Sequence, residues 1–518
     1  MDFLHWKNMS DIYLSEDIEN YNLVAKLSDD KGNLSFRITH KFGGKHFAEH
    51  KKVQILNEDL EIIGSENINK NNISHLILNI KKNGINDGLF VIKDKKNFYI
   101  NKVLTIKNIN PESVRHKETI SEKSFTATGE KLNFHWPIFK KYKETGYGSI
   151  IRATMTLHQV CMSRCQFCST IGRNKKDSIN LNEAKNFVNV LYDDQANFNI
   201  KNFAQYNQEY KKINNSDIRL QGLILSGGGQ PNLWPHFSEF VKWVSEKNIS
   251  LGLITNGFPK NVPEEVYEKF DWIRISITPE DASSFYPQGK FNLQYIPKNI
   301  INNPKIALGL SYVYGPWTTD EILNRINKTS KDWNCEYVRV LTDCNLSRDL
   351  QLLSHKGLSN RLFKLGFIDE DGNPKTKIFH QLKYHGTKKE ADIIWDEGQC
   401  YLQVFNTFWD TTGHEDSGFS YCYPCDSVTV LAEGNQEEDY NILNVHSERK
   451  FNYKKWGTVI NNEVDKLFTE KVRPFFDPRK NCSACLFQKN NAKAKELSNL
   501  AKYDDINYNK NIKHVNFP

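Results

Sequence analysis

The sequence predicts an α/β protein whose centre is a partial (β/α)6 TIM-like barrel. An N-terminal α+β accessory domain precedes the barrel, and a small C-terminal cysteine-rich, metal-binding domain follows it. Strand-like and helix-like runs alternate through the middle of the chain, short β-branched runs separated by turns precede them, and all cysteines lie at or beyond Cys161. At about 150 residues per domain the chain has room for three or four domains. We place three, at 1–148, 149–344 and 345–518.

Composition narrows the class of protein. Hydrophobic residues make up 39% of the chain and charged residues 25%, which is typical of a folded globular protein and excludes a wholly disordered one. No run approaches the roughly 20 apolar residues of a membrane span, and the start lacks the basic and apolar regions of a signal peptide. The net charge of +7 is spread along the chain rather than gathered in a basic arm, which argues against a nucleic-acid partner. We expect a cytoplasmic protein with no membrane partner.

The barrel prediction depends on six apolar runs, most of them followed by a helix-like pattern. Such alternation is typical of parallel βαβ units. The connection 195–219 is polar and rich in asparagine, so we expect an insertion over one end of the barrel. The strands are expected at 149–157, 221–228, 250–257, 271–278, 305–315 and 336–344, and the helices at 181–194, 236–248, 263–270, 295–303 and 318–334.

Short runs outside the barrel complete the prediction. Before it we expect strands at 33–42, 52–57, 60–65, 88–93 and 97–106 and one helix at 73–84 that ends at a glycine. After it we expect helices at 348–366, 461–476 and 492–503, a strand at 427–434, irregular segments around the cysteines, and a poorly ordered tail from residue 507 onward.

Three cysteines, Cys161, Cys165 and Cys168, follow the first barrel strand with the spacing C-x3-C-x2-C. Gaps this short let one loop direct three thiolates at a single metal cluster. A [4Fe–4S] cluster ordinarily takes four cysteines, so three in a loop leave one iron open to a substrate or cofactor. Zinc with a distant fourth ligand is the alternative.

This loop, after a first strand and before a helix, resembles that of the radical S-adenosylmethionine (SAM) superfamily. After the second strand, Ser226-Gly-Gly-Gly-Gln-Pro231 is similar to the family's "GGE" segment, which binds the amino group of SAM. Here Gln230 replaces the usual glutamate, which keeps an acceptor oxygen and loses the charge. After the third strand, Thr255-Asn256-Gly257 is similar to the family's "TNG". The resemblance covers about 200 residues.

The resemblance implies further SAM contacts. Gly228, Gly229 and Gln230 would bind the amino group, and Thr255 and Asn256 belong to the next loop. Ser276 would contact the ribose, although it is also compatible with a plain barrel-interior position. Three residues of the fifth strand and one aromatic residue lie where the family contacts adenine or ribose: Gly309, Ser311, Val313 and Phe167.

The family chemistry follows from these assignments. SAM would chelate the open iron, one electron would cleave its sulfonium, and the 5′-deoxyadenosyl radical would abstract hydrogen from a substrate. An electron donor of the flavodoxin or ferredoxin type is implied, and the site should lie at the C-terminal ends of the strands. Asp343 and Cys344 end the sixth strand there and are weak candidates for a catalytic role. A structural role for Cys344 is the alternative, and Cys335 is expected to be inert.

The last five cysteines form a second group: Cys400, Cys422, Cys425, Cys482 and Cys485. Two C-x2-C pairs bracketing a small domain indicate a metal site. After a radical SAM core this layout resembles SPASM/twitch domains, although a full SPASM domain has seven cysteines. We expect one auxiliary [4Fe–4S] cluster, with one cysteine left over, and structural zinc is the alternative.

The expected function is radical SAM modification of a peptide or protein side chain. Modification of RNA or a nucleotide is a second reading, and a zinc-stabilised binding protein without catalysis is a third. Many peptide-modifying relatives carry an N-terminal winged-helix domain that binds the leader peptide. Residues 1–148 do not show that pattern clearly, and a ParB-type fold or an unassigned scaffold are the other interpretations.

Overall fold

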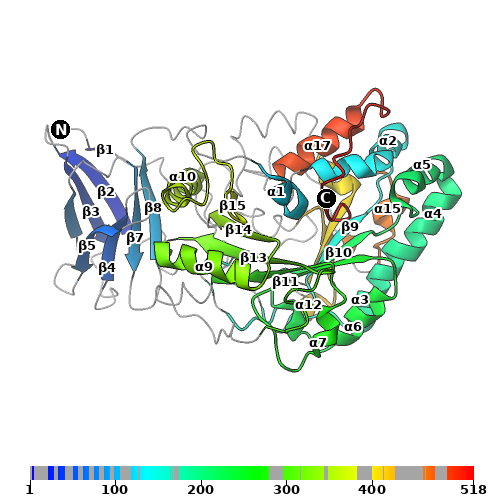
Figure 1. Ribbon diagram of the computed structural model, residues 1–518, viewed down its shortest axis with the longest axis horizontal. Coiled ribbons are helices and arrows are strands. Elements are labelled where there is room, and N and C mark those ends of the chain that lie inside the picture. The colour runs from blue at the N-terminus through cyan, green and yellow to red at the C-terminus, as the bar shows by residue number, and fades with distance from the viewer. Residues whose placement is uncertain are drawn as a thin grey trace.

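The computed structural model describes eight strands within residues 3–105 and most of the chain from residue 118 onward (Figure 1). The later described ranges are 118–126, 129–163, 165, 167–168, 174–278, 296–315, 317–342, 348–381, 399–411, 414–425, 459–460, 462–472 and 487–518.

A ten-stranded sheet forms the centre of the molecule, in the order β15-β14-β13-β12-β11-β10-β9-β16-β17-β18. Its strands from β15 to β16 are all parallel, and only β17 and β18 join in antiparallel pairs. The six expected barrel strands are present and adjacent in chain order, which confirms the mixed α/β class and the parallel core. They are β9 (Arg152–Met155), β10 (Gly222–Leu225), β11 (Ser250–Thr255), β12 (Trp272–Ser276), β13 (Ala307–Tyr314) and β14 (Tyr337–Thr342).

Helices cover one face of this sheet (Figure 1). We call the apolar layer between the helices and the sheet the outer core. Strand residues such as Leu253, Ile273 and Leu310 meet helix residues such as Phe240 and Leu323 in this layer, and all five are fully buried. The helices are α3 (Leu181–Asn189), α6 (Phe237–Ser245), α7 (Glu264–Tyr267), α9 (Asp320–Asp332) and α10 (Arg348–Lys364). The helix expected at 295–303 is a series of turns over the described residues 296–303.

Side-chain caps define where two of these helices begin. Asn180 accepts from the backbone N–H of Glu183 at 2.9 Å, and the Glu183 carboxylate accepts in return from the Asn180 N–H at 3.2 Å, so α3 starts with a capping box. Thr319 caps α9 by accepting from Ile322 N–H at 3.3 Å.

The connection 195–219, which was expected to be an insertion over one end of the barrel, is mostly helical. A π-helical turn (Val190–Asp194) joins α3 to α4 (Gln195–Asn202), and α5 (Ala204–Asn214) follows. Polar residues of this connection, such as Gln195 and Asn199, are buried and bond to the backbone. Gln195 bonds both the N–H and the C=O of Ile150, at 2.7 and 2.8 Å, which fixes α4 against the approach to β9.

The strands before residue 106 form two antiparallel four-stranded sheets, in the orders β1-β2-β3-β6 and β5-β4-β7-β8. The helix expected at 73–84 is wrong, because His75–Ile80 is strand β6 and pairs with β3. A short apolar run is compatible with either element, and cross-strand pairing decides it. The other strands are β1 (Phe3–Leu4), β2 (Tyr21–Ser28), β3 (Asn33–His40), β4 (Lys51–Leu56), β5 (Ile62–Ile68), β7 (Asp87–Lys93) and β8 (Tyr99–Thr105).

Residues beyond 344 add strands to both edges of the central sheet. β15 (Ile378–Gln381) pairs with β14, and β16 (Asn406–Asp410) pairs with β9. The C-terminal segment therefore completes the sheet of the barrel. The remaining elements are β17 (Tyr421–Tyr423), β18 (Val459–Ile460), α12 (His414–Ser417), α15 (Lys466–Thr469) and α17 (Gln488–Asn499). The strand expected at 427–434 lies outside the described residues.

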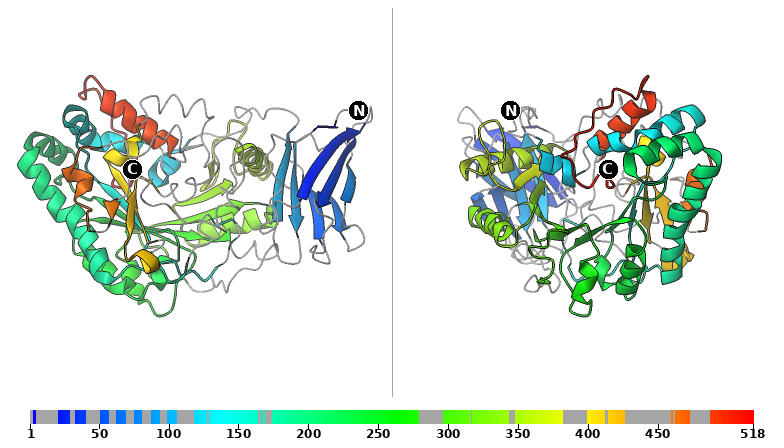
Figure 2. Two further views of the ribbon diagram at one scale, coloured as in Figure 1. Left: turned by 180° about the vertical axis from the view of Figure 1, so that it is seen from behind. Right: turned by 45° about the vertical axis from the view of Figure 1, so that its right-hand side comes forward.

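A second apolar cluster surrounds α2 (Trp136–Thr145), and we call it the α2 core. Residues of α2 and of the preceding 3-10 turn Glu130–His135 meet the 3-10 turn Tyr401–Val404 and helix α17 there. Figures 1 and 2 show α17 lying beside α2. None of the helices in the described part of the chain has the length and apolar character needed to cross a membrane.

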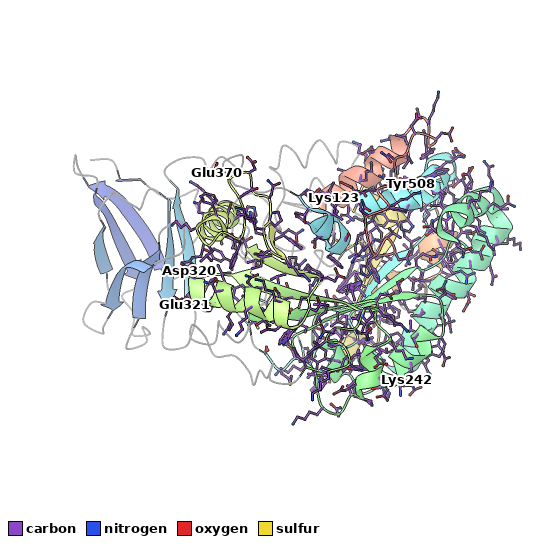
Figure 3. All side chains as sticks on the ribbon, viewed as in Figure 1. Lys123, Lys242, Asp320, Glu321, Glu370 and Tyr508 are labelled. Atoms are coloured by element: carbon purple, nitrogen blue, oxygen red, sulfur yellow. The ribbon has the colours of Figure 1, made fainter. Side chains whose placement is uncertain are left out.

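The tail is packed against the N-terminal ends of the barrel strands, so the prediction of a poorly ordered tail was wrong. Phe517 is 5% exposed, and its ring lies 5.5 Å from that of Trp272 at the start of β12. Lys131 donates to the Phe517 carbonyl at 2.8 Å. Trp136 donates at 2.6 Å to the hydroxyl of Tyr508, the tail residue labelled in Figure 3. With α1 (Ile120–Phe125), the tail closes this end of the barrel with aromatic side chains.

Candidate active site

Three loops that follow β9, β10 and β11 meet at the C-terminal ends of these strands. The first carries the three cysteines, the second the glycine-rich segment and the third Thr255-Asn256-Gly257. Because the strands are parallel neighbours, their carboxyl ends lie at one edge of the sheet. Hydrogen bonds connect each loop with the next.

Asn256 joins the third loop to the cysteine loop. Its Nδ2 donates to the hydroxyl of Ser163 at 2.9 Å and lies 3.5 Å from the sulfur of Cys161. The same sulfur accepts from the backbone N–H of Ser163 at 3.4 Å. Two N–H donors thus face the Cys161 sulfur.

The other two cysteines share the turn of this loop. Cys165 is buried, Cys168 is half-buried, and the Cys168 N–H donates to the Cys165 carbonyl at 3.0 Å. Among the residues that the structure describes, no three His, Cys, Asp or Glu side chains gather closely enough to hold a metal ion. Ligation by Cys161, Cys165 and Cys168 therefore stays a prediction from their spacing.

The glycine-rich loop lies directly against the backbone that leads into the cysteine loop. A Cβ on Gly229 would stand 2.3 Å from the Val160 carbonyl oxygen, and one on Gly228 would stand 1.7 Å from the Gln159 side chain. Gly227 has φ +91°, a conformation that favours glycine. The Gly229 N–H donates to His158 O at 3.1 Å. Each glycine here is required by close approach or by its φ.

We expect Gly229→Ala to abolish SAM binding, because the new methyl group would meet backbone atoms that have no room to move. Titration of SAM against the anaerobically reconstituted variant measures this, with an affinity loss of at least about tenfold expected, or about 1.4 kcal/mol. Gly418→Ala is the matched control, since that glycine also has positive φ but nothing within 4 Å of its Cβ position. Unchanged SAM affinity in Gly229→Ala would contradict the site.

Gln230 connects the second loop to the third and leaves one oxygen available. It is 2% exposed, and its side-chain Nε2 donates to the Gly257 carbonyl at 3.1 Å. Its backbone carbonyl accepts from His158 Nε2 at 2.7 Å. Its Oε1 is buried and has no hydrogen-bond partner in the described part of the chain. A buried acceptor without a donor is costly, so this oxygen fits a ligand that brings an N–H group.

Buried polar side chains hold the third loop. Thr255 donates to the Gly257 carbonyl at 2.7 Å, and Asn232 donates to the same oxygen at 2.9 Å. Burial lowers the pKa of His158, which favours the neutral ring that donates to the Gln230 carbonyl. The Gly257 carbonyl is thus saturated with donors, which fixes the loop.

The remaining predicted contacts line the neighbouring strands. Ser276 on β12 and Ser311 on β13 are register partners, so their side chains share one face of the sheet. The ring of Phe167 lies 5.6 Å from that of Trp317, which follows β13. The structure therefore brings the cysteine loop to the strand that carries Ser311. No ligand tests these contacts, which remain predictions.

Sequence reasoning missed the contribution of β16. This strand runs parallel to β9 and ends in Asp410, which is 2% exposed, and Thr411, which is fully buried. Gln159 Nε2 donates to the Thr411 hydroxyl at 3.2 Å, directly beneath Gly228. The aromatic residues of the segment Phe405-Asn-Thr-Phe-Trp409 were the available signal, but the surrounding cysteines led us to expect irregular structure.

The C-terminal cysteines lie in two different apolar layers. Cys400 and Cys425 belong to the α2 core, whereas Cys422 belongs to the outer core. Burial raises the pKa of Cys400 to about 11 and that of Cys422 to about 12. Cys335 is fully buried in the outer core, and burial raises its pKa to about 12, as expected of an inert thiol. Asp343, Cys344, Cys482 and Cys485 lie outside the described residues.

No family model and no curated protein matches the chain. Among solved structures it is similar to Streptococcus suis SuiB bound to S-adenosylmethionine, with 12% identity over 57% of this chain and a TM-score of 0.38. It is also similar to SuiB bound to precursor peptide SuiA, with 11% identity over 60% of this chain and 68% of that chain and a TM-score of 0.36. A third similar structure is anSMEcpe with bound AdoMet, with 13% identity over 53% of this chain and 74% of that chain and a TM-score of 0.31. The first match spans 65% of the SuiB chain, just under two thirds.

These similarities are distant and assign no family to the chain. Three cysteines follow the first parallel strand, the glycine-rich segment follows the second, and Thr255-Asn256-Gly257 follows the third. Hydrogen bonds join the cysteine loop, the glycine-rich loop and the third loop to one another. This order of motifs along a parallel sheet is the order that the sequence resemblance to the radical SAM superfamily predicts.

Proposed function

We propose that this protein binds a [4Fe–4S] cluster through Cys161, Cys165 and Cys168 and cleaves SAM reductively to abstract hydrogen from a substrate. The hydrogen bonds that join the cysteine loop, the glycine-rich loop and the third loop to one another are the observation that carries the proposal. Bound cluster and SAM together would supply the electron transfer and the 5′-deoxyadenosyl radical. An external reductant of the flavodoxin or ferredoxin type completes the proposal.

The residues of the chain would place and shield the reactants. Gln230 Oε1, buried and lacking a donor among the described residues, would accept from the SAM ammonium group. Backbone of Gly228 and Gly229 allows the ligand to approach without Cβ atoms in the way. Ser276 and Ser311 would contact the ribose, and Phe167, beside Trp317, would cover the adenine.

Detection of 5′-deoxyadenosine tests the proposal. The protein is reconstituted anaerobically, reduced with dithionite, supplied with SAM and analysed by mass spectrometry. We expect 5′-deoxyadenosine and methionine in equal amounts. Tightly bound zinc together with no 5′-deoxyadenosine would overturn the proposal in favour of a binding protein.

We propose a peptide or protein side chain as the substrate. The cysteine-rich C-terminal segment and the large N-terminal segment, with its two antiparallel sheets, support a macromolecular substrate. One similar structure, SuiB, is described as bound to a precursor peptide. The absence of a concentrated basic segment in the sequence disfavours RNA.

We also propose one auxiliary [4Fe–4S] cluster, held by Cys400, Cys425, Cys482 and Cys485, with Cys422 as the cysteine left over. The strand β17 supports this choice. Its Tyr421 and Tyr423 lie in the α2 core with Cys400 and Cys425, and Cys422 between them faces the outer core. Successive residues of a strand point to opposite faces, so Cys422 faces away from the other two.

Iron content distinguishes Cys422 from Cys425. We expect reconstituted wild-type protein to hold about eight irons, Cys425→Ala about four and Cys422→Ala about eight, because only Cys425 is a ligand. The two variants are matched, as both remove one thiol of the same C-x2-C pair. Loss of iron in Cys422→Ala, or full iron in Cys425→Ala, would contradict the assignment.

A further inference from the structure

Two rows of residues on the inward face of the barrel strands, opposite the outer core, bring together two arginines. The register pairs Arg274 with Gly309 and Gly309 with Tyr337, so these residues of β12, β13 and β14 form one row. A Cβ on Gly309 would stand 2.1 Å from the ring of Tyr337, which shows that this ring lies across the glycine toward Arg274. The row above it contains Ser311 and Arg339.

Arg274 has a guanidinium with no counter-charge in the described structure. Its side chain is half-buried, and it makes a hydrogen bond with the Tyr337 phenol. Its guanidinium carbon lies 5.8 Å from the centre of the Trp272 ring. Its Nε is buried without a hydrogen-bond partner among the described residues. No inward-facing position of the described strands β9 to β15 holds Asp or Glu, so the strands bring no carboxylate to it.

A second guanidinium lies in the next row. Arg339 Nη2 donates to the Ser311 hydroxyl at 3.4 Å. Burial raises the pKa of the Tyr337 phenol, and the charges of both Arg274 and Arg339 oppose that rise. Both positive charges therefore lie near the same phenol oxygen.

Aromatic rings close the side of this group that faces the N-terminal ends of the strands. Phe125 of α1 stacks on Tyr337 with ring centres 4.2 Å apart, and Phe517 of the tail packs on Trp272. The arginines lie between these rings and the three motif loops. A ligand group that reaches them from the motif loops would enter a weakly solvated region, where charge pairing is strong.

We propose that Arg274, Arg339 and Tyr337 form a subsite that binds an oxyanion of the substrate, a carboxylate or a phosphate. The inference deepens the proposed function, since it requires a substrate that inserts an acidic group into the barrel beneath SAM. A guanidinium fork binds such a group through two parallel hydrogen bonds. A half-buried cation without a counter-charge is costly, and a bound anion removes that cost.

Binding of two small anions tests the subsite directly. Glutarate and inorganic phosphate are titrated by calorimetry against wild-type protein, Arg274→Gln and Arg274→Lys, with folding checked by circular dichroism. We expect wild type to bind one of the anions and Arg274→Gln to lose at least about tenfold in affinity. Arg274→Lys, which keeps the charge without the fork, should fall between the two. Arg219→Gln is the control, because Arg219 pairs with Asp217 at 3.1 Å outside the barrel strands.

Each result has a defined meaning. Binding of glutarate assigns a carboxylate, and binding of phosphate alone assigns a phosphate. No binding by wild type, or equal binding by wild type and a folded Arg274→Gln or Arg274→Lys, overturns the subsite. Because the titration does not depend on SAM cleavage, anion binding without cleavage would refute the proposed function alone. Cleavage without anion binding would refute the subsite alone.

Discussion

Replacing Cys161 with alanine is expected to abolish SAM cleavage. The Cys161 sulfur receives the Ser163 N–H and faces Asn256 Nδ2, so it is the point where the cysteine loop and the third loop meet. With one of three cluster ligands removed, the open iron would no longer be held beside Gln230. We expect 5′-deoxyadenosine to fall by at least about 10³-fold, or about 4 kcal/mol of lost transition-state stabilisation.

Cys335→Ala is the control for this experiment. Cys335 is fully buried in the outer core, at the start of β14 and outside the three loops. Its loss removes a thiol of similar burial to Cys165 without touching the proposed site. Cleavage that survives in Cys161→Ala would show that the cluster is held elsewhere, and loss of cleavage in a folded Cys335→Ala would weaken the comparison.

Mild acid is expected to destabilise the packing of the tail through His135. This side chain is fully buried, its Nε2 donates to the Val515 carbonyl at 2.9 Å, and its Nδ1 accepts from the Tyr210 hydroxyl at 2.8 Å. Both bonds suit the neutral ring, and burial lowers its pKa to about 4. The unfolded chain takes up this proton near pH 6.5, well before the folded chain does.

This difference in proton uptake sets the direction in which stability changes with pH. Between about pH 6.5 and pH 4 the unfolded state binds more protons, so the free energy of unfolding falls as the pH falls. Above about pH 6.5 the stabilising contribution of the neutral His135 ring is complete. A lowering of about 2.5 pKa units corresponds to about 3 kcal/mol. His514, which packs on Phe125, has its pKa lowered to about 4 by burial and adds to the same trend.

Denaturant unfolding at a series of pH values measures this effect. We expect His135→Gln to be less stable than wild type near neutral pH but to lose less stability on acidification. His236→Gln, at an exposed position, should keep the wild-type slope. Equal pH slopes in His135→Gln and wild type would exclude His135 as the sensitive group.

The barrel could be predicted from the sequence because its signals are local. Each strand is an apolar run, each motif directly follows a strand, and parallel alternation gives their order. Gln230 could be recognised as a departure from the family pattern. The unpaired Oε1 of its side chain could not, because that depends on how the Gln230 amide lies against Gly257 of the third loop.

The errors concern elements fixed by distant partners. The tail is polar in sequence, yet its backbone carbonyls accept from Lys131 and His135, almost 400 residues earlier in the chain. Residues 75–80 form a strand because β3 pairs with them. The strand β16 forms beside β9, more than 250 residues away. In each case tertiary contacts decide a conformation that local sequence leaves open.

The same reason explains why the C-terminal cysteines could not be sorted from sequence. Cys422 and Cys425 form a C-x2-C pair, which is typical of shared ligation. Only the alternation of β17 shows that Cys422 faces the outer core and Cys425 the α2 core. Within this pair, Cys422 therefore occupies a core position and Cys425 is the proposed ligand.

Electron paramagnetic resonance of the SAM-binding cluster tests the central claim most directly. The measurement uses reconstituted, reduced Cys425→Ala protein, so that the signal of the proposed auxiliary cluster is removed. If Cys161, Cys165 and Cys168 hold a cluster with an open iron beside Gln230, adding SAM will shift the spectrum, and the additional change Gly229→Ala will remove the shift. A cluster spectrum that SAM leaves unchanged would contradict the account.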